Sequence, residues 1–165
     1  MSERVLYSAC LLGVRCAFDG CDRRAKLPRG FPAAGEIPVP VCPEQLGGLP
    51  TPRVPAEIIG GTGFDVLDGS AGVFSRKGRD VTDAFLRGAR EAVRVARITG
   101  CERAVLAEGS PSCGTDWHYD GSFSGRRVRG PGTTAAALVR AGLEVAAPKE
   151  VPGSAGKNEP SRTRS

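Results

Sequence analysis

Three short apolar runs of this chain each lead into a turn-forming motif that contains a cysteine. The runs and their cysteines are Arg4–Ser8 before Cys10, Ile37–Val41 before Cys42, and Arg103–Ala107 before Cys113. Short runs of this kind, bounded by Gly, Pro and Ser, are typical of strands. In an open α/β sheet, ligands bind outside the carboxyl ends of the strands. We therefore expect the three thiols to converge on one site, although they are far apart in the sequence.

The rest of the chain alternates helices with strands, which predicts βαβ units and a parallel sheet flanked by helices. The clearest helix is expected over 80–99, with Asp80 or Thr82 as its cap and Gly100 at its end. Its apolar residues recur at helical spacing, at Val81, Phe85, Ala89, Val93 and Ala96. A second helix is expected over 133–141, followed by a last strand over 143–146.

Length and composition predict one α/β domain over residues 1–147. The chain has 165 residues, which is typical of a single domain. Residues 148–165 are rich in Pro, Gly, Ser and charge, so we expect a disordered tail. No run of about 18 apolar residues is present, and the start lacks the apolar core of a signal peptide. A cytoplasmic protein with reduced or metal-bound cysteines is therefore expected, with no membrane partner and with its oligomeric state left open.

The net charge of +5 gives little support to nucleic-acid binding. Four basic and two acidic residues beyond Pro148 account for +2 of it, which leaves +3 for the body of the chain. The local clusters are Arg23–Arg24 and Arg126–Arg129. Nucleic-acid binders show a dense basic stripe or an aromatic stacking platform, and this chain is poor in aromatics. Solvated surface arginines are the simpler interpretation, and a nucleotide or RNA contact stays open.

The cysteines allow three interpretations: inert core thiols, redox or nucleophilic groups, or ligands of a metal or iron–sulfur cluster. Thiolate ligands suit zinc and iron–sulfur clusters. No Cys-x-x-Cys pair exists, which argues against a structural zinc ribbon. Cys101 follows the helix-ending glycine and fits a core role. The sequence leaves open whether Cys16 or Cys21 also serves as a ligand.

Three further side chains are candidates for the chemistry. Glu44 lies two residues after Cys42 and is the best candidate for a general acid or base. Ser110 and Ser112 flank Pro111 just before Cys113, where either hydroxyl reaches a bound group or only bonds within the turn. The lone histidine, His118, is expected to be a structural residue of a hairpin. The Gly- and Pro-rich stretch 42–53 is expected to exclude a regular helix.

Several ordered motifs over residues 4–147 together resemble the thiouracil desulfidase family. They are Ser8–Gly13 with Phe18–Gly20, Cys42–Arg53, Asp80–Thr82, Ser110–Gly114, Tyr119–Gly121 with Phe123–Gly125, and Gly130–Ala135. The resemblance implies a Rossmann-like α/β core with a [4Fe–4S] cluster bound by three cysteines. These map to Cys10, Cys42 and Cys113, and the family's catalytic glutamate and serine map to Glu44 and Ser110, with Ser112 as the alternative serine.

By this resemblance, the expected activity is cluster-dependent, non-redox conversion of thiouracil-like compounds to their oxo forms with release of hydrogen sulfide. Because the chain shows no second domain, a free thiolated pyrimidine base or nucleoside is the expected substrate. Two alternatives remain: desulfidation of thiolated tRNA, with Arg126, Arg127 and Arg129 on phosphates, and a non-catalytic protein that binds a metal or cluster.

Overall fold

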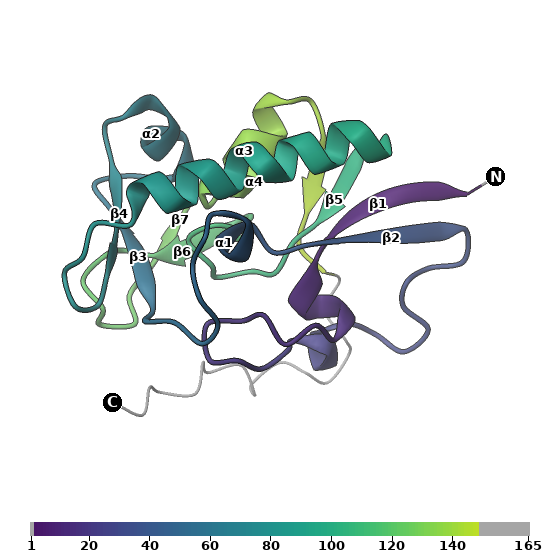
Figure 1. The fold of residues 1–165 in the computed structure, drawn as a ribbon, viewed down its shortest axis with the longest axis horizontal. Coiled ribbons are helices and arrows are strands. Elements are labelled where there is room, and N and C mark those ends of the chain that lie inside the picture. Colours follow the sequence, from purple (N-terminus) through teal and green to yellow (C-terminus); the bar gives the residue numbers. More distant parts are fainter. Residues whose placement is uncertain (1, 149–165) are drawn as a thin grey trace.

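A computed structural model describes residues 2–148, so the expected tail, apart from Pro148, lies outside the described residues. The strands are β1 (Glu3–Ser8), β2 (Glu36–Val41), β3 (Ala56–Ile59), β4 (Gly72–Ser75), β5 (Arg103–Val105), β6 (Trp117–Tyr119), β7 (Arg127–Arg129) and β8 (Glu144–Ala146). The α-helices are α1 (Pro43–Leu46), α2 (Gly63–Asp68), α3 (Thr82–Thr99) and α4 (Thr133–Arg140). Two 3-10 turns, η1 (Ala9–Leu12) and η2 (Arg24–Lys26), complete the set (Figure 1).

The central sheet is parallel throughout, with strand order β2-β1-β5-β8. This confirms the predicted α/β class, a parallel sheet flanked by helices. β1 lies in the middle and pairs Ser8 with Val41 of β2 and Tyr7 with Val105 of β5. The carboxyl ends of three strands therefore meet at one edge, and the chain that follows each of them carries one of the three cysteines.

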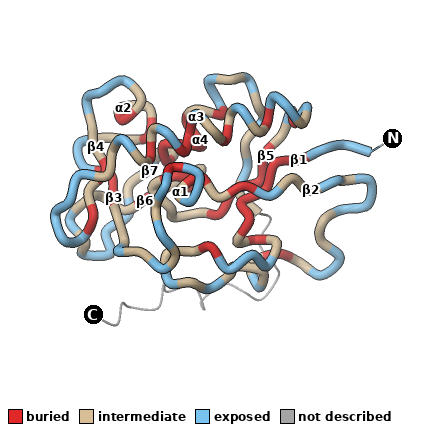
Figure 2. Tube along the Cα trace, viewed as in Figure 1, coloured by how far each residue is buried: buried red, intermediate tan, exposed pale blue. Residues whose placement is uncertain are grey.

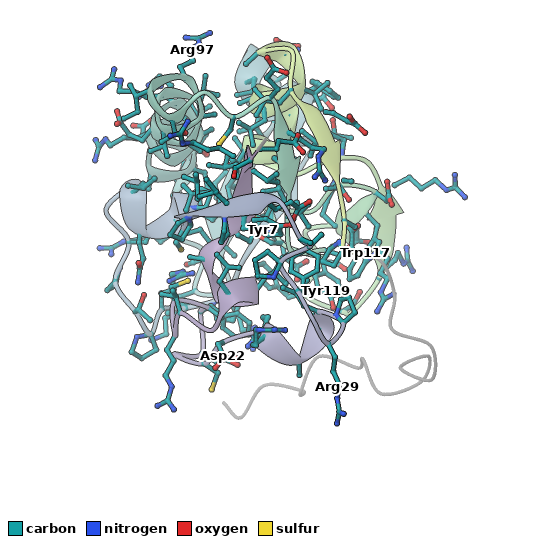
Figure 3. The ribbon with its side chains drawn as sticks, turned by 90° about the vertical axis from the view of Figure 1, so that its right-hand side faces the viewer. Tyr7, Asp22, Arg29, Arg97, Trp117 and Tyr119 are labelled. Carbon is teal, nitrogen blue, oxygen red and sulfur yellow. The ribbon has the colours of Figure 1, made fainter. Side chains whose placement is uncertain are left out.

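Alternation along β1 divides the core between the two faces of the sheet. Leu6 belongs to the apolar cluster that α3 and α4 cover, together with Leu106 and Cys113. Val5 and Tyr7 belong to the opposite cluster, beneath η1 and Leu27. Figure 2 shows these buried segments gathered around β1 and β5. In Figure 3 Tyr7 lies within the molecule, whereas Arg29 and Arg97 point outward. The cysteine-bearing edge thus follows the buried part of β1, residues 5–8.

Two small antiparallel sheets extend the domain beyond the parallel core. β6 and β7 form a hairpin that places His118 opposite Val128, so the expected hairpin around His118 is confirmed. β3 and β4 form the other sheet, and α2 connects them. The sequence patterns gave no prediction for β3, α2 or β4, because these elements have only four to six residues each.

Several element boundaries differ from expectation. α3 begins at Thr82, and the Asp80 carboxylate just before it accepts a hydrogen bond from the Thr82 N–H at 2.9 Å. Its buried stripe includes Ala92, while Val93 is only partly buried. The expectation that residues 42–53 exclude a helix is wrong, because α1 starts at Pro43. Proline is compatible with the first turn, where its missing N–H would have no helical partner.

Candidate metal-cluster site

Three thiols come together just outside the carboxyl end of β1 and β2. The Cys42 Sγ atom approaches the Cys16 carbonyl oxygen at 3.8 Å. Contact with the Cys10 thiol is the largest cause that raises the pKa of Cys16, to about 11. Contact with the Cys16 thiol, followed by burial, raises the pKa of Cys42 far above its usual value. Cys16 therefore contacts both Cys10 and Cys42, and the raised pKa values keep the Cys16 and Cys42 thiols protonated at neutral pH when no cation is bound.

Cys113 reaches the same edge from the loop after β5. Burial raises the pKa of Cys113 to about 12, and nearby Glu44 and Cys42 add to the shift. The Ser110 hydroxyl accepts hydrogen bonds from the N–H groups of Ser112 and Cys113, both at 3.1 Å. The Ser112 hydroxyl donates toward the Cys113 Sγ atom at 3.8 Å. The structure thus places all three predicted cysteines around one site, and Cys16 joins them.

The two candidate serines occupy different environments. Ser112 is buried, with 2% of its surface exposed, whereas Ser110 is half-buried. Their hydroxyl oxygens lie 2.8 Å apart. Both serines bond within the turn, as the simpler interpretation expected, and Ser110 is the one that solvent or a ligand reaches.

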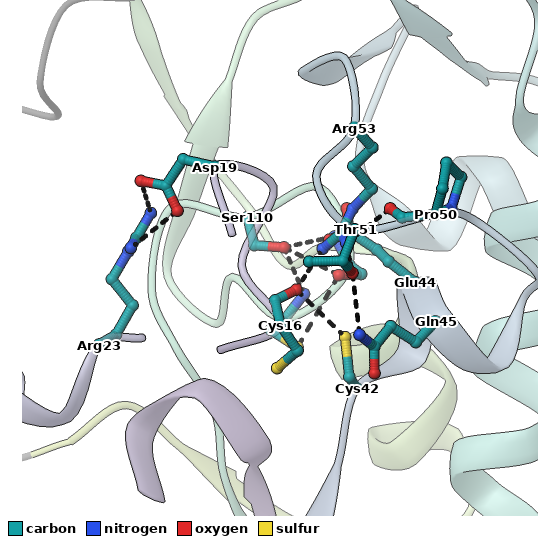
Figure 4. A network of polar contacts seen from close by, with 12 residues as sticks. Cys16, Asp19, Arg23, Cys42, Glu44, Gln45, Pro50, Thr51, Arg53 and Ser110 are labelled. Carbon is teal, nitrogen blue, oxygen red and sulfur yellow. Dashed lines mark hydrogen bonds and ion pairs between the residues drawn. The ribbon is translucent and has the colours of Figure 1, made fainter. Parts of the chain in front are cut away.

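The Glu44 carboxylate is fixed beside the thiols by a buried arginine. The Arg53 Nη2 atom donates to Glu44 Oε2 at 2.6 Å and to the Cys16 carbonyl oxygen at 2.9 Å. The Arg53 side chain is 6% exposed and that of Glu44 is 17% exposed. Figure 4 shows this set, in which dashed lines join Arg53 to Glu44 and to Cys16. A carboxylate and several thiols therefore share one partly enclosed site.

Glycines bring α1 against α3 and so place both Cys42 and Glu44. A Cβ atom at Gly88 of α3 would lie 2.0 Å from the Pro43 carbonyl oxygen. A Cβ atom at Gly47 would lie 2.0 Å from the Ala84 carbonyl oxygen. Because no side chain fits at either contact, the two helices meet backbone to backbone. Cys42 and Glu44, which flank Pro43, are thereby held at a fixed height above the sheet.

The chemistry of these donors fits an iron–sulfur cluster better than a single ion. Thiolates are the usual ligands of such clusters. Within residues 2–148, no three or more His, Cys, Asp or Glu side chains are arranged to hold one metal ion. In a cluster each thiolate binds a different iron, so its ligands stand farther apart than those around one ion. Cys10, Cys42 and Cys113, on three separate loops, fit that larger group.

In the described part of the chain, the other sequence candidates take no part in the hydrogen bonds among the thiols, Glu44 and Arg53. Cys101 is buried in the apolar core, as expected, and Cys21 is exposed. His118 is 1% exposed, and its Nδ1 atom lies 2.8 Å from the Tyr119 carbonyl oxygen, which fits a structural role. The sequence interpretation missed Arg53 and left Cys16 open. The signal available for Arg53 was its place as the one arginine of the Pro- and Gly-rich stretch 42–53, which also carries Cys42 and Glu44.

Together, the parallel sheet and the thiols at its carboxyl edge define an α/β protein with a candidate cluster site. The chain belongs to the 2-thiouracil desulfurase family, whose model matches residues 5–150. This confirms the family that the sequence motifs resembled.

Two relatives extend this match over most of the chain. YbbK, an uncharacterized protein of Bacillus subtilis (strain 168), is 42% identical over 147 residues, which cover 89% of this chain and 97% of YbbK. A solved structure of TudS, a [4Fe–4S]-dependent thiouracil desulfidase, superposes with a TM-score of 0.73 at 36% identity. That match covers 92% of this chain and 94% of TudS. The similarity therefore includes the whole parallel core and its carboxyl edge.

Proposed function

We propose that this protein is a [4Fe–4S]-dependent desulfidase that converts thiouracil-like compounds to their oxo forms and releases hydrogen sulfide. The observation that carries the proposal is the convergence of three cysteines and one carboxylate at the carboxyl edge of the sheet. Membership of the 2-thiouracil desulfurase family and the likeness to TudS support it.

Cys10, Cys42 and Cys113 would hold the cluster, each through its deprotonated sulfur. Because the thiol pKa values of Cys42 and Cys113 are raised, cluster binding must displace their protons. When bound through these three thiolates, a four-iron cluster would keep one iron without a protein ligand, and that iron would supply Lewis-acid chemistry toward a thiocarbonyl sulfur. Three cysteines would thus hold the group and would leave one position for substrate.

Glu44 would act as the general base of the reaction. Its carboxylate accepts a proton from a water molecule, whose oxygen then forms the new bond to the carbon that bears sulfur. The C–S bond breaks as the C–O bond forms, and sulfur leaves as hydrogen sulfide after taking up two protons. Water supplies the oxygen and both protons, so the reaction needs neither an oxidant nor a reductant.

Ser110 would orient the substrate ring or pass a proton. Its hydroxyl is half-buried and is fixed by two backbone N–H groups and by the Ser112 hydroxyl. A hydroxyl held in this way has a defined direction before substrate arrives, which lowers the cost of ordering it in the reaction. Ser112, being buried, would support Ser110 and the Cys113 loop.

Anaerobic purification with iron and sulfide quantitation and a visible absorption spectrum tests the cofactor. Hydrogen sulfide release from 2-thiouracil, measured together with formation of uracil, tests the reaction. We expect about four irons per chain and one sulfide released per uracil formed. A fully loaded protein that turns over none of several thiolated pyrimidines would contradict the enzyme and favour a non-catalytic cluster protein.

We expect the native substrate to be a free base or nucleoside rather than tRNA. Arg126, Arg127 and Arg129 form the local basic cluster, but Arg126 lies near Asp120 at 3.8 Å and Arg127 stacks over Trp117 at 3.9 Å. So small a patch supplies few phosphate contacts. Comparing kcat/KM for 2-thiouracil, 4-thiouracil, 4-thiouridine and thiolated tRNA decides the matter. A preference for tRNA that weakens with salt and with Arg127→Ala would favour the tRNA alternative.

A further inference from the structure

Arg53 is a cation in the wall of the candidate site, and the proposed reaction assigns it no step. Its side chain is 6% exposed, which is unusual for arginine unless its charge is paired. Its partner is Glu44, at 2.6 Å. Glu44 is two residues from Cys42, so the pair belongs to the edge where the thiols converge.

The guanidinium also ties together two loops that approach from different strands. Nη2 donates to the carbonyl oxygen of Cys16, in the loop after β1, and to Glu44, in the segment after β2. Nη1 donates to the Pro50 carbonyl oxygen at 3.2 Å and to the Thr51 hydroxyl at 3.1 Å. A planar fork with several fixed donors constrains direction as well as distance, which a lysine cannot do. The orientation of the Glu44 carboxylate is therefore set by Arg53.

Stability alone is a poor explanation for this arrangement. A buried ion pair is often no more stabilising than apolar residues of similar size, because both charges must leave water. The Arg53 Nε atom is also buried without a hydrogen-bond partner among residues 2–148, which adds a further desolvation cost. Burial of Arg53 is therefore costly in free energy, and its Nε donor gains no hydrogen bond. This cost is better explained if Arg53 is needed to orient the Glu44 carboxylate.

We propose that Arg53 is a positioning residue that acts through Glu44 and holds the carboxylate at a fixed place beside the Cys16–Cys42 contact. This inference rests on the proposed function, because it assigns the geometry of the proposed base. It predicts that Arg53 contributes to turnover only while Glu44 is present, and that the two side chains are coupled in the folded protein whether or not substrate is turned over.

A double-mutant cycle with Arg53→Met, Glu44→Gln and the combined variant, all purified anaerobically, tests the proposal. For Arg53→Met we expect normal iron content, a fall in kcat of about 10²-fold from misplacement of the base, and little change in KM. In the Glu44→Gln background, Arg53→Met should cause no further loss. Three results would each overturn the proposal: losses of kcat that multiply in the combined variant, full activity of Arg53→Met, or loss of iron from Arg53→Met.

Thermal unfolding of the same anaerobic proteins gives a readout that is independent of turnover. Glu44→Gln leaves the buried Arg53 cation without its counter-charge, so we expect its Tm to fall by about 2–4 °C or more, and Arg53→Met to restore part of that loss. Tm changes that simply add would overturn the coupling. If the wild-type protein releases no hydrogen sulfide, the proposed function fails, and this cycle still decides whether Arg53 and Glu44 act as a unit.

Two further variants complete the design. Arg53→Lys keeps the charge but loses the fork, so it should retain iron and lose less activity than Arg53→Met. It also serves in place of Arg53→Met if that variant does not fold. Arg140→Met is the matched control, because Arg140 forms an exposed pair with Asp68 at 2.8 Å, away from the thiols. It should leave iron content and turnover unchanged.

Discussion

β1, β2 and β5 contribute to both ends of the parallel sheet, but the two ends carry different side chains. The amino end carries ion-paired residues, and the carboxyl end is followed by thiols. At the amino end, β1, β2 and β5 begin at Glu3, Glu36 and Arg103. Arg103 pairs with Glu3 at 3.3 Å and also with Glu36, and the Tyr7 hydroxyl donates to Glu36 at 2.5 Å. At the carboxyl end, the chain after each strand carries a thiol.

The difference shows which end needs a ligand. At the amino end each of these charges has a partner of opposite sign, so the network is complete as it stands. At the carboxyl end Cys16 contacts the thiols of Cys10 and Cys42, and the raised pKa values of Cys16 and Cys42 show that neighbouring sulfurs and burial oppose ionisation. A cation or cluster would reverse that opposition, since metals bind thiolates. Variants at the two ends should therefore separate binding from simple stability.

The largest expected effect is loss of the cluster when a ligand is removed. Cys10→Ser, Cys42→Ser and Cys113→Ser should each lose most of the bound iron and all measurable turnover, because serine is a poor substitute for a soft thiolate. Cys16→Ser, Cys21→Ser and Cys101→Ser should keep their iron. Iron quantitation after anaerobic purification measures this directly. At the opposite end, Arg103→Met should keep both iron and turnover.

One pattern would reverse the ligand assignment. If Cys16→Ser strips the iron while Cys42→Ser keeps it, Cys16 is the ligand and Cys42 is its neighbour. Loss of the cluster should also lower stability, since the cluster joins loops from three strands. A cluster-free Cys42→Ser protein that unfolds at the wild-type temperature would contradict that part of the expectation.

The second effect isolates chemistry from cofactor binding. Glu44→Gln is nearly isosteric but removes the proton acceptor, so it should retain iron and lose about 10²–10⁴-fold in turnover. Hydrogen sulfide release at full iron content measures it. Ser110→Ala should lose less. At the amino end, Glu36→Gln should leave turnover unchanged, and near-normal activity of Glu44→Gln would remove Glu44 from the mechanism.

The convergence of the three cysteines at the carboxyl end can be predicted from the sequence, whereas the contacts of Cys16 and Arg53 cannot. The apolar runs that end near Cys10, Cys42 and Cys113 are enough to predict a shared site. Parallel strands place their carboxyl ends at one edge of the sheet regardless of the loop conformations. The position of Cys16 beside Cys42 depends on how the loop after η1 turns back, and cysteine spacing in the sequence does not predict that loop conformation. Arg53 pairs with Glu44 across a Pro- and Gly-rich loop, where side-chain direction follows from tertiary contacts rather than from periodicity.

The third effect tests whether backbone contact places the site. Gly88→Ala should gain about 1 kcal/mol in helix propensity. The added Cβ, at 2.0 Å from the Pro43 carbonyl oxygen, forces α1 away and should cost about 1–3 kcal/mol from overpacking. We expect lower stability in urea and reduced turnover, because Cys42 and Glu44 move with α1. Arg90→Ala, on the exposed side of α3, is the control. Wild-type turnover for Gly88→Ala would show that α1 adapts without harm.

The smallest expected effect is a pH-dependent loss of stability when Glu36, at the amino end of the sheet, is replaced. Burial opposes ionisation of Glu36, but hydrogen bonds from Tyr7 and Arg103 outweigh it and lower the pKa of that carboxyl. Its ionised form therefore adds stability that is fully present above the ordinary glutamate value of about 4.3 and is lost as the pH falls through the lower folded-state pKa. Glu36→Gln should cost about 1 kcal/mol at pH 7 and progressively less toward pH 3. Urea unfolding of both proteins at each pH measures the difference, and comparison at equal pH cancels any acid loss of iron. A cost that stays constant down to pH 3 would mean that the amino end is held by packing rather than by charge.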